Sequence, residues 1–295
     1  LDGLVIGPKD TKGNPPALLE VDALDVSIAW RELLRGRILG DLILEGARFH
    51  YNPDLIDDLK NQKSDKTKNN SDVKQMGGQL VVLEIDMVTI KNSDLYFKVL
   101  DFPDETPLLS QIEGQATGLK LTGEKNKKEQ SYITLKANVL RLAPITAWGN
   151  FIPYSKPQDW DFNVELKKLE LTKLNFFLKK WLPLTFTTGD LSVVAEVRSK
   201  QSEILGYVKP YLQNVDVVGN REEFMSFKHL GVETVTAIAN LVFRDAGKKS
   251  FLTRVPFRKK PDQKVEFDWA EAIRTTVQHG FNEPQSAMME ESISL

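Results

Sequence analysis

Few side chains in this sequence are of the types that perform catalysis or bind metal ions. The three histidines, His50, His229 and His279, are widely separated. None has a second histidine at the spacing that metal ligands adopt on one helix or strand. We therefore expect each to be a surface or partly packed side chain. The chain has no cysteine, which excludes disulfides, thiolate zinc sites and cysteine nucleophiles.

Adjacent carboxylates are the other candidates for chemistry. The pairs Asp57–Asp58 and Glu222–Glu223 could supply an acid and a base. Neighbouring positions on a helix point about 100° apart, however, so the carboxylates of a pair do not converge on one substrate atom. No G-x-S-x-G, phosphate-binding loop or G-x-G-x-x-G pattern occurs. The sequence predicts that the protein is not an enzyme and uses no metal ion or cofactor.

Composition limits the class of partner. The formal net charge of −2 gives no electrostatic basis for binding nucleic acid. Hydrophobic residues make up 41% and charged residues 27% of the chain, which is ordinary for a soluble protein with a real core. The lysines between residues 63 and 74 are diluted by acids and asparagines, so we interpret residues 61–78 as a mobile, solvated loop.

Alternation of apolar and polar residues dominates the first two thirds of the sequence and predicts strands. Each alternating run has one apolar face and one polar face, as expected of antiparallel strands with one dry side. We predict a mainly β fold: a long curled antiparallel sheet forming an open groove, with short helices and a C-terminal α/β segment. The residues predicted to line the groove are Leu24, Val26, Ile28, Leu83, Ile85, Met87, Leu95, Phe97, Leu135, Val139, Val164, Leu166, Val193 and Val197.

Helical spacing appears in four places. Residues 30–36 are predicted to form one or two helical turns, and residues 172–181 a helix that covers the sheet. After Ser199 the character changes, and residues 222–243 and 268–279 show helical spacing. We therefore divide the chain into a β-groove domain, residues 1–198, and a C-terminal α/β segment, residues 199–295.

Aromatic residues gather around two prolines between residues 148 and 160. Trp148, Phe151, Tyr154 and Trp160 could line the portal of a ligand site. A packed, proline-rich loop that plugs one end of the sheet is the alternative, and we favour it slightly.

Three segments, taken in order, resemble the AsmA-like family. Residues 18–51 (LLEVDALDVSIAWRELLRGRILGDLILEGARFHY) resemble the start of its periplasmic part. Residues 160–197 (WDFNVELKKLELTKLNFFLKKWLPLTFTTGDLSVVAEV) are similar to its strand, short helix and Gly-Asp-Leu strand. Residues 204–218 (ILGYVKPYLQNVDVV) are similar to a segment of its short members of unknown function. The resemblance covers nearly the whole chain, but residues 61–78 do not map onto the pattern.

The resemblance implies a curled antiparallel sheet whose apolar face binds phospholipid or another acyl-chain ligand. Larger relatives are thought to carry phospholipid between the inner and outer membranes along such a groove. It also implies a periplasmic protein tethered to the inner membrane by an N-terminal helix. This chain lacks such a helix and begins at Leu1 without a methionine, so we expect a cleaved leader or an anchor outside it.

Two functions of different classes would use the same apolar strands. The first is a lipid-binding groove that acts as a carrier or bridge element in the cell envelope. The second is a structural or assembly factor whose sheet edges and C-terminal helices bind an inner-membrane or envelope protein, because strand edges offer unpaired backbone groups. The sequence alone does not separate these two functions.

Overall fold

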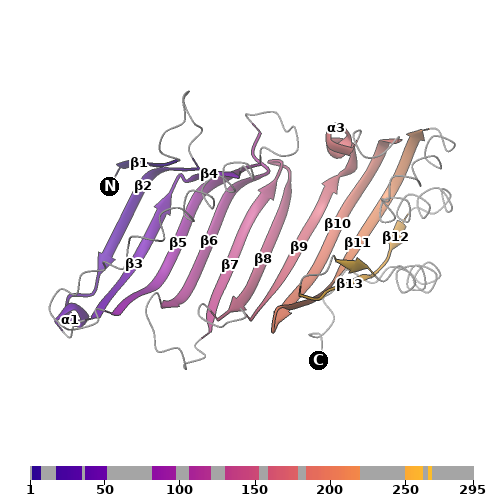
Figure 1. The fold of residues 1–295 in the computed structure, drawn as a ribbon. Coiled ribbons are helices and arrows are strands. Elements are labelled where there is room, and N and C mark those ends of the chain that lie inside the picture. The colour runs from indigo at the N-terminus through magenta and orange to yellow at the C-terminus, as the bar shows by residue number, and fades with distance from the viewer. Residues whose placement is uncertain are drawn as a thin grey trace, which may run out of the picture. The chain divides into compact units, whose positions relative to one another are not determined.

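A computed structural model describes residues 2–7, 18–34, 37–51, 82–97, 106–120, 130–152, 159–178, 184–219, 250–261 and 265–267. Most of these residues form strands (Figure 1), so the mainly β fold predicted from the alternation is confirmed. The chain divides into two compact units, residues 1–141 with 150–155, and residues 142–149 with 156–295. The domain boundary predicted between residues 198 and 199 lies inside a strand, β10 (Leu184–Lys200).

The first unit is a sheet with the strand order β1-β2-β3-β5-β6-β7, in which the short strand β4 pairs with β2 and β5. Helix α1 (Trp30–Leu33) follows β2, where residues 30–36 predict helical turns. The strands are β1 (Asp2–Ile6), β2 (Leu19–Ile28), β3 (Arg37–Glu45), β4 (Arg48–Tyr51), β5 (Val82–Phe97), β6 (Leu109–Lys120) and β7 (Ser131–Val139).

Two strand pairs of this unit depart from the antiparallel sheet that the sequence predicts. Strand β5 runs parallel to β3 and to β4. The pairs β1–β2, β2–β3, β5–β6 and β6–β7 are antiparallel. Parallel neighbours need a connection of about a dozen residues or more. Residues 52–81, between β4 and β5 in the sequence, are numerous enough for such a connection. A short hairpin turn would be too short to connect parallel strands.

The second unit has the strand order β8-β9-β10-β11-β13-β14, with β12 also paired to β11; the last two residues of β8 belong to the first unit. Between β9 and β10, the short helices η2 (Leu171–Leu174) and α3 (Asn175–Leu178) lie where residues 172–181 predict a helix. The other strands are β8 (Ala143–Phe151), β9 (Trp160–Glu170), β11 (Glu203–Gly219), β12 (Ser250–Leu252), β13 (Val255–Lys259) and β14 (Glu266–Phe267).

The predicted C-terminal α/β segment is described only in its strands. Strand β11 and the short strands β12 to β14 account for most of the described residues after Ser199. The predicted loop 61–78 and the predicted helices 222–243 and 268–279 lie outside the described residues.

Each unit contains a line of residues with left-handed backbone conformation on neighbouring strands. In the first unit these are Gly46 just after β3, Asn92 in β5 and Gln111 in β6. The three lie at about the same level of the sheet. In the second unit they are Lys168, Gly189 and Asn214, in β9, β10 and β11. Such residues form β-bulges, which bend a strand and increase its local twist. We call these two sets the bend lines.

Side chains from the next strand satisfy the backbone groups that the bend lines remove from the ladder. The Asn92 N–H donates to Glu113 Oε1 (2.9 Å), and the Gln111 N–H donates to Asp94 Oδ1 (3.1 Å). In the second unit the Lys168 N–H donates to Ser192 Oγ (3.0 Å). Because unpaired backbone groups are costly, these polar side chains make the bends possible.

Candidate ligand-binding surface

Two rows of apolar residues cross β2, β3, β5, β6 and β7 in the first unit. Residues paired directly on neighbouring strands point to the same face of a sheet, so the register defines each row. We call the two rows together the first apolar surface. One row is Leu24, Leu44, Ile90, Gly114 and Leu135, and the other is Val26, Leu42, Val88, Ala116 and Ile133. Val26 is 58% exposed and the remaining members are partly exposed.

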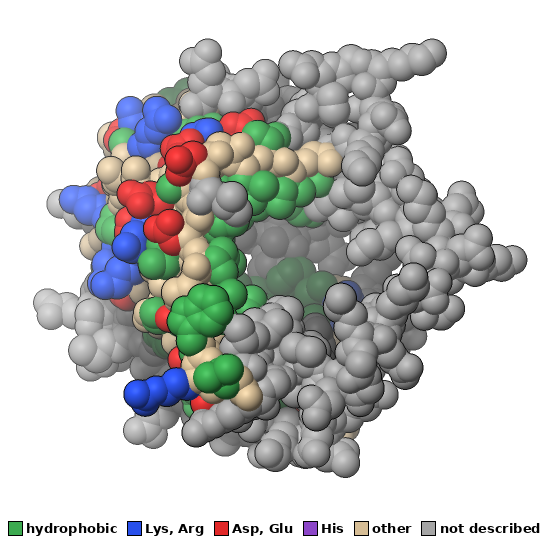
Figure 2. All heavy atoms as spheres, turned by 90° about the vertical axis from the view of Figure 1, so that its left-hand side faces the viewer, with side chains coloured by type: hydrophobic (Ala, Val, Ile, Leu, Met, Phe, Trp, Pro, Cys, Tyr) green, Lys and Arg blue, Asp and Glu red, His purple; other side chains and the backbone are tan. Residues whose placement is uncertain are grey.

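The rows between these point to the opposite face and are mostly polar. They consist of Asp25, Ile43, Thr89, Gln115 and Thr134, and of Ser27, Asp41, Met87, Thr117 and Tyr132. Figure 2, which looks onto the N-terminal strands, shows hydrophobic side chains along one side of the strands and charged side chains gathered on the other. This part of the first unit is therefore an amphipathic sheet.

The second unit carries an apolar surface of the same kind on β9, β10, β11 and β13. Its rows, which we call the second apolar surface, are Phe162, Val197, Gly206 and Phe257; Val164, Ala195, Val208 and Val255; Leu166, Val193 and Pro210; and Leu169, Leu191 and Leu212. Most members are partly exposed, like those of the first surface. The surface runs along β10 from Leu191 to Val197.

Glycines allow aromatic rings to lie against this second surface. A Cβ atom on Gly206 would lie 2.6 Å from Phe257 Cζ, and one on Gly149 would lie 2.6 Å from Phe162 Cδ1. Two rings therefore occupy the space that side chains at these positions would take. The result is a broad apolar face, which suits a flexible hydrocarbon chain better than a small rigid ligand.

One end of the second surface is closed by packed side chains. Leu171 and Phe186 form a buried cluster, and the surface residues Leu191 and Leu212 pack against it together with Leu174. Asn175 fixes this end because its side-chain amide bonds both the carbonyl (2.7 Å) and the N–H (2.9 Å) of Phe186. The helix predicted to cover the sheet does so here, over the end of the apolar face.

The structure places the predicted groove residues in several different settings. Leu24, Val26 and Leu135 belong to the first apolar surface. Val164, Leu166, Val193 and Val197 all belong to the second. Leu95 and Val139 belong to a row beyond the first bend line, whose other members are Leu19, Phe49 and Leu109. Phe97 pairs with Tyr51 and stacks on its ring (4.8 Å between centroids). Ile28 and Ile85 both pair with Gly40, and the Leu83 side chain lies outside the described residues.

Met87 does not share a face with Val26, contrary to the single dry face predicted for these strands. Its direct partners are Asp41 and Thr117, in a polar row, and the Gln115 amide donates to its sulfur. The pairing of β5 with β3 shifts by one residue between Ile85 and Met87. Because the side-chain period of a strand is two, this bulge moves Met87 to the polar face and brings Val88 to the apolar one.

Several members of the two surfaces were not predicted as groove residues. Leu42 and Leu44 alternate with Asp41 and Glu45 in the sequence, so the alternation rule alone would have found them. Val88 and Ile90 could not be found in this way, because their alternation is out of phase with that of Leu83 and Ile85. Only the observed register shows the change of phase.

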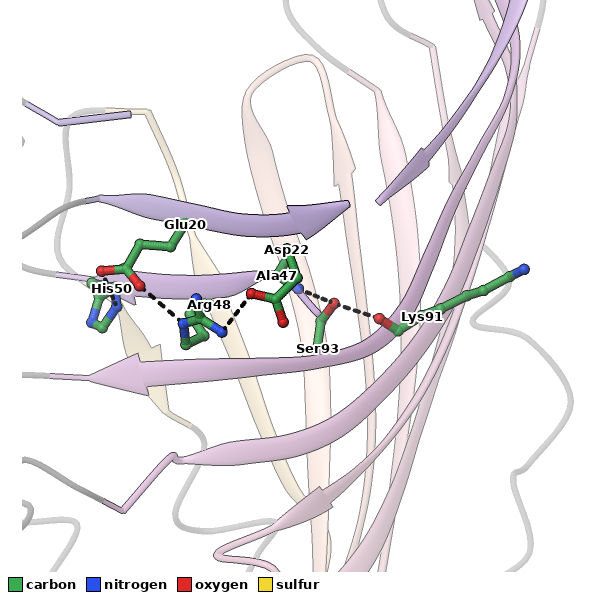
Figure 3. A network of polar contacts seen from close by, with 7 residues as sticks. All are labelled: Glu20, Asp22, Ala47, Arg48, His50, Lys91 and Ser93. Carbon is green, nitrogen blue, oxygen red and sulfur yellow. Dashed lines mark hydrogen bonds and ion pairs between the residues drawn. The ribbon is translucent and has the colours of Figure 1, made fainter. Parts of the chain in front are cut away.

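A network of polar side chains joins β2, β4 and β5 at the first bend line (Figure 3). The Arg48 guanidinium bonds Glu20 through Nε (2.9 Å) and Asp22 through Nη1 (3.0 Å), and both carboxylates raise its pKa. Buried Ser93 accepts a hydrogen bond from the Ala47 N–H (3.0 Å) and donates to the Lys91 carbonyl (2.8 Å). The network therefore links the strands where their backbone ladder is interrupted.

His50 lies at the edge of this network. Its Nε2 is 4.0 Å from Glu20 Oε1, and its ring stacks on Tyr96 at 5.0 Å between centroids. Burial raises the pKa of Tyr96, and the nearby charge of Asp94 raises it further. The described residues contain no group of three or more metal-ligating side chains. We interpret the network as structural, because the bonds of Arg48 and Ser93 each join neighbouring strands.

Comparison with known proteins adds no family to these observations: no family model, curated protein or solved structure matches the chain. Over the part of the chain that the structure describes, no helix is both long enough and apolar enough to cross a membrane.

Proposed function

We propose that the protein binds the acyl chains of phospholipid or a similar ligand on its apolar sheet faces, without catalysing a reaction. The observation that carries the proposal is the register, which lines up partly exposed apolar side chains across neighbouring strands in each unit. Each methylene that leaves water contributes about 0.8 kcal/mol, so an acyl chain lying along either surface gains substantial free energy.

The proposed setting is the cell envelope, where the protein would carry phospholipid or bridge its passage from a position tethered to the inner membrane. The resemblance of three segments to the AsmA-like family supports this setting. Contiguous apolar faces also favour a lipid ligand on physical grounds, because large exposed apolar patches are rare on monomeric soluble proteins.

A role in assembling envelope proteins is the second candidate, and strand β1 favours it. Among the described strands, β1 pairs with β2 alone, so its other edge presents backbone groups to a further strand. Val5 is 64% exposed and Ile6 is 48% exposed. An apolar edge strand of this kind could accept a strand from another protein.

The lipid proposal is tested by extracting lipid from protein purified from cells and measuring lipid per protein by mass spectrometry. Val26→Asp and Val193→Asp place a carboxylate on the first and second apolar surfaces. Each change makes acyl contact unfavourable by several kcal/mol, because the charge must lose water when the chain binds. We expect each variant to carry less lipid and the double variant to carry very little.

Two further variants separate loss of ligand from loss of fold. Ser27 is exposed on the face opposite Val26, so Ser27→Asp should leave both lipid content and stability unchanged. Val194, next to Val193, is only 1% exposed, so Val194→Asp should unfold the second unit. Wild-type protein without lipid would contradict the proposal, as would equal lipid content in Val26→Asp and Ser27→Asp, and assembly through β1 would then be the leading function.

A further inference from the structure

The two ends of the second apolar surface differ in chemistry. At one end the surface runs into the buried cluster of Leu171 and Phe186. At the other end, beyond the row that contains Val197, the next row on the same face is Trp160, Ser199, Ile204 and Lys259. One end is therefore closed and apolar, whereas the other carries an indole and a cationic side chain.

Lys259 is the cation at this open end, and the register fixes the face on which it lies. It pairs directly with Ile204, whose other partner is Ser199, so it extends the second apolar surface by one row. Its side chain is partly buried. Within the described residues, no carboxylate forms an ion pair with it. A lysine can lay its methylenes along an apolar surface while its ammonium group stays at the edge.

Two carboxylates at this end of the sheet, Glu203 and Asp159, have other partners. Glu203 forms an ion pair with Arg258, which lies on the face of β13 opposite Lys259. Glu266 of β14 is the residue directly across from Arg258 in the sheet. Asp159 accepts a hydrogen bond from the Gln201 N–H at 3.1 Å. Among the described residues no carboxylate neutralises Lys259, so its charge can meet a negatively charged ligand group.

Trp160 completes the open end. Its ring contacts that of Phe162, the next residue along β9 on the same face, at 5.5 Å between centroids. Indole rings favour boundaries where one side is apolar and the other is wet, because the ring buries area while its N–H finds a polar partner. Trp160 and Lys259 stand at the two ends of one row, with Ser199 and Ile204 between them. A row with an indole and an ammonium group matches the boundary between acyl chains and their head groups.

We propose that the second apolar surface binds an amphiphile with an anionic head group, the head near Lys259, in the row that also holds Trp160, and the chain directed toward the end of the surface at Leu171. This inference rests on the proposed function and adds the charge and the direction of the ligand. The rows from Ser199 to Leu191 span about 26 Å at about 3.3 Å per residue. One leaflet of a bilayer core is about 15 Å thick, so the surface holds a whole acyl chain.

The charge is tested by titrating delipidated full-length protein with two myristoyl probes, lysophosphatidic acid and lysophosphatidylcholine, below the concentration at which they form micelles. Wild-type protein should bind the anionic probe more tightly, and Lys259→Glu should weaken that probe about fivefold or more while changing the zwitterionic probe little. Lys260→Glu is the matched control, since Lys260 is exposed beyond the end of β13. It should keep the preference of wild type.

The direction is tested by quenching of tryptophan fluorescence with stearate that carries a nitroxide either near the carboxylate or near the chain end. Subtracting the signal of Trp160→Phe isolates Trp160. Quenching of Trp160 should be stronger with the nitroxide near the carboxylate. Stronger quenching from the chain end would overturn the inferred direction.

The outcomes separate this inference from the function on which it rests. If wild type binds neither lysolipid, the proposed function itself fails. If both bind equally and Lys259→Glu behaves like Lys260→Glu, acyl binding stands but the anionic head-group site is wrong. Inorganic phosphate should not displace the anionic probe at millimolar concentration; full displacement would show a phosphate site that does not need the chain, which also contradicts the inference.

Discussion

Met87 and Val88 show how one residue decides which side of this sheet a side chain faces. The sequence places Met87 in phase with Leu83 and Ile85, and simple alternation would assign all of them to one face. The bulge at Asp86 changes the phase, so Met87 joins polar Asp41 and Val88 joins apolar Leu42. Strand β5 itself has no glycine at the bulge, which is why alternation along this strand could not predict it.

Tyr96 offers a residue-level prediction at the first bend line. Burial raises its pKa first, and Asp94 raises it further by repelling the phenolate. Asp94→Asn should therefore lower the pKa of Tyr96 while leaving it above the value of an exposed tyrosine. Ultraviolet titration, with Tyr96→Phe as the subtraction control, measures the change. An unchanged or higher pKa in Asp94→Asn would show that Asp94 has no such influence.

The same shift has a consequence for stability. Because the pKa of Tyr96 is raised in the folded state, its contribution to stability is present below about pH 10 and is lost as pH rises through the folded pKa. We expect wild type to lose more stability than Tyr96→Phe between neutral pH and alkaline pH, as measured by urea unfolding. A parallel loss in both proteins would contradict this linkage.

At the scale of elements, both units contain a bend line. Neighbouring strands adopt left-handed conformations at one level, and polar side chains bond the backbone N–H groups that leave the ladder. Gly189 and Asn214 are residue types that the sequence can suggest for such positions, but Gln111 and Lys168 are not. The strands themselves were predictable from alternation, and their bends were not.

Gly189 is the position where the second bend line tolerates least change. Its φ is +132°, and a Cβ would lie 2.8 Å from Leu171 Cδ1 and 3.2 Å from Val215 Cα. Gly189→Val should lower the free energy of unfolding by about 3 kcal/mol, from strain and overpacking combined. Gly3→Ala, with φ +69° and open space around it, is the control that isolates strain. Equal urea midpoints for the two variants would contradict this account.

Ser192 tests the capping of a bend directly. Its hydroxyl accepts the hydrogen bond from the Lys168 N–H, so Ser192→Ala should destabilise the second unit by about 1 kcal/mol. Ser192→Thr keeps the acceptor and should lose less. Hydrogen exchange at the Lys168 amide provides a local measurement. Unchanged protection of that amide in Ser192→Ala would show that the hydroxyl is not its partner.

At the scale of the whole molecule, the sequence predicted the class of fold but not its connectivity. Many alternating runs without a β-α-β rhythm led to the mainly β fold, and the described strands agree with it. The parallel pairing of β3 and β4 with β5 joins strands that residues 52–81 separate in the sequence. No pattern within a single strand encodes such a pairing. The four groove residues predicted in the second unit share one face because β10 is regular between Leu191 and Val197.

Crosslinking from two adjacent positions shows whether acyl chains lie on the apolar faces of these sheets. A benzophenone amino acid is placed at Val26, on the first apolar surface, or at Ser27, on the opposite face. After irradiation in cells, mass spectrometry of the purified protein detects lipid adducts. We predict lipid adducts from position 26 and few from position 27. Equal labelling from both positions, or none from position 26 in folded protein, would contradict the claim.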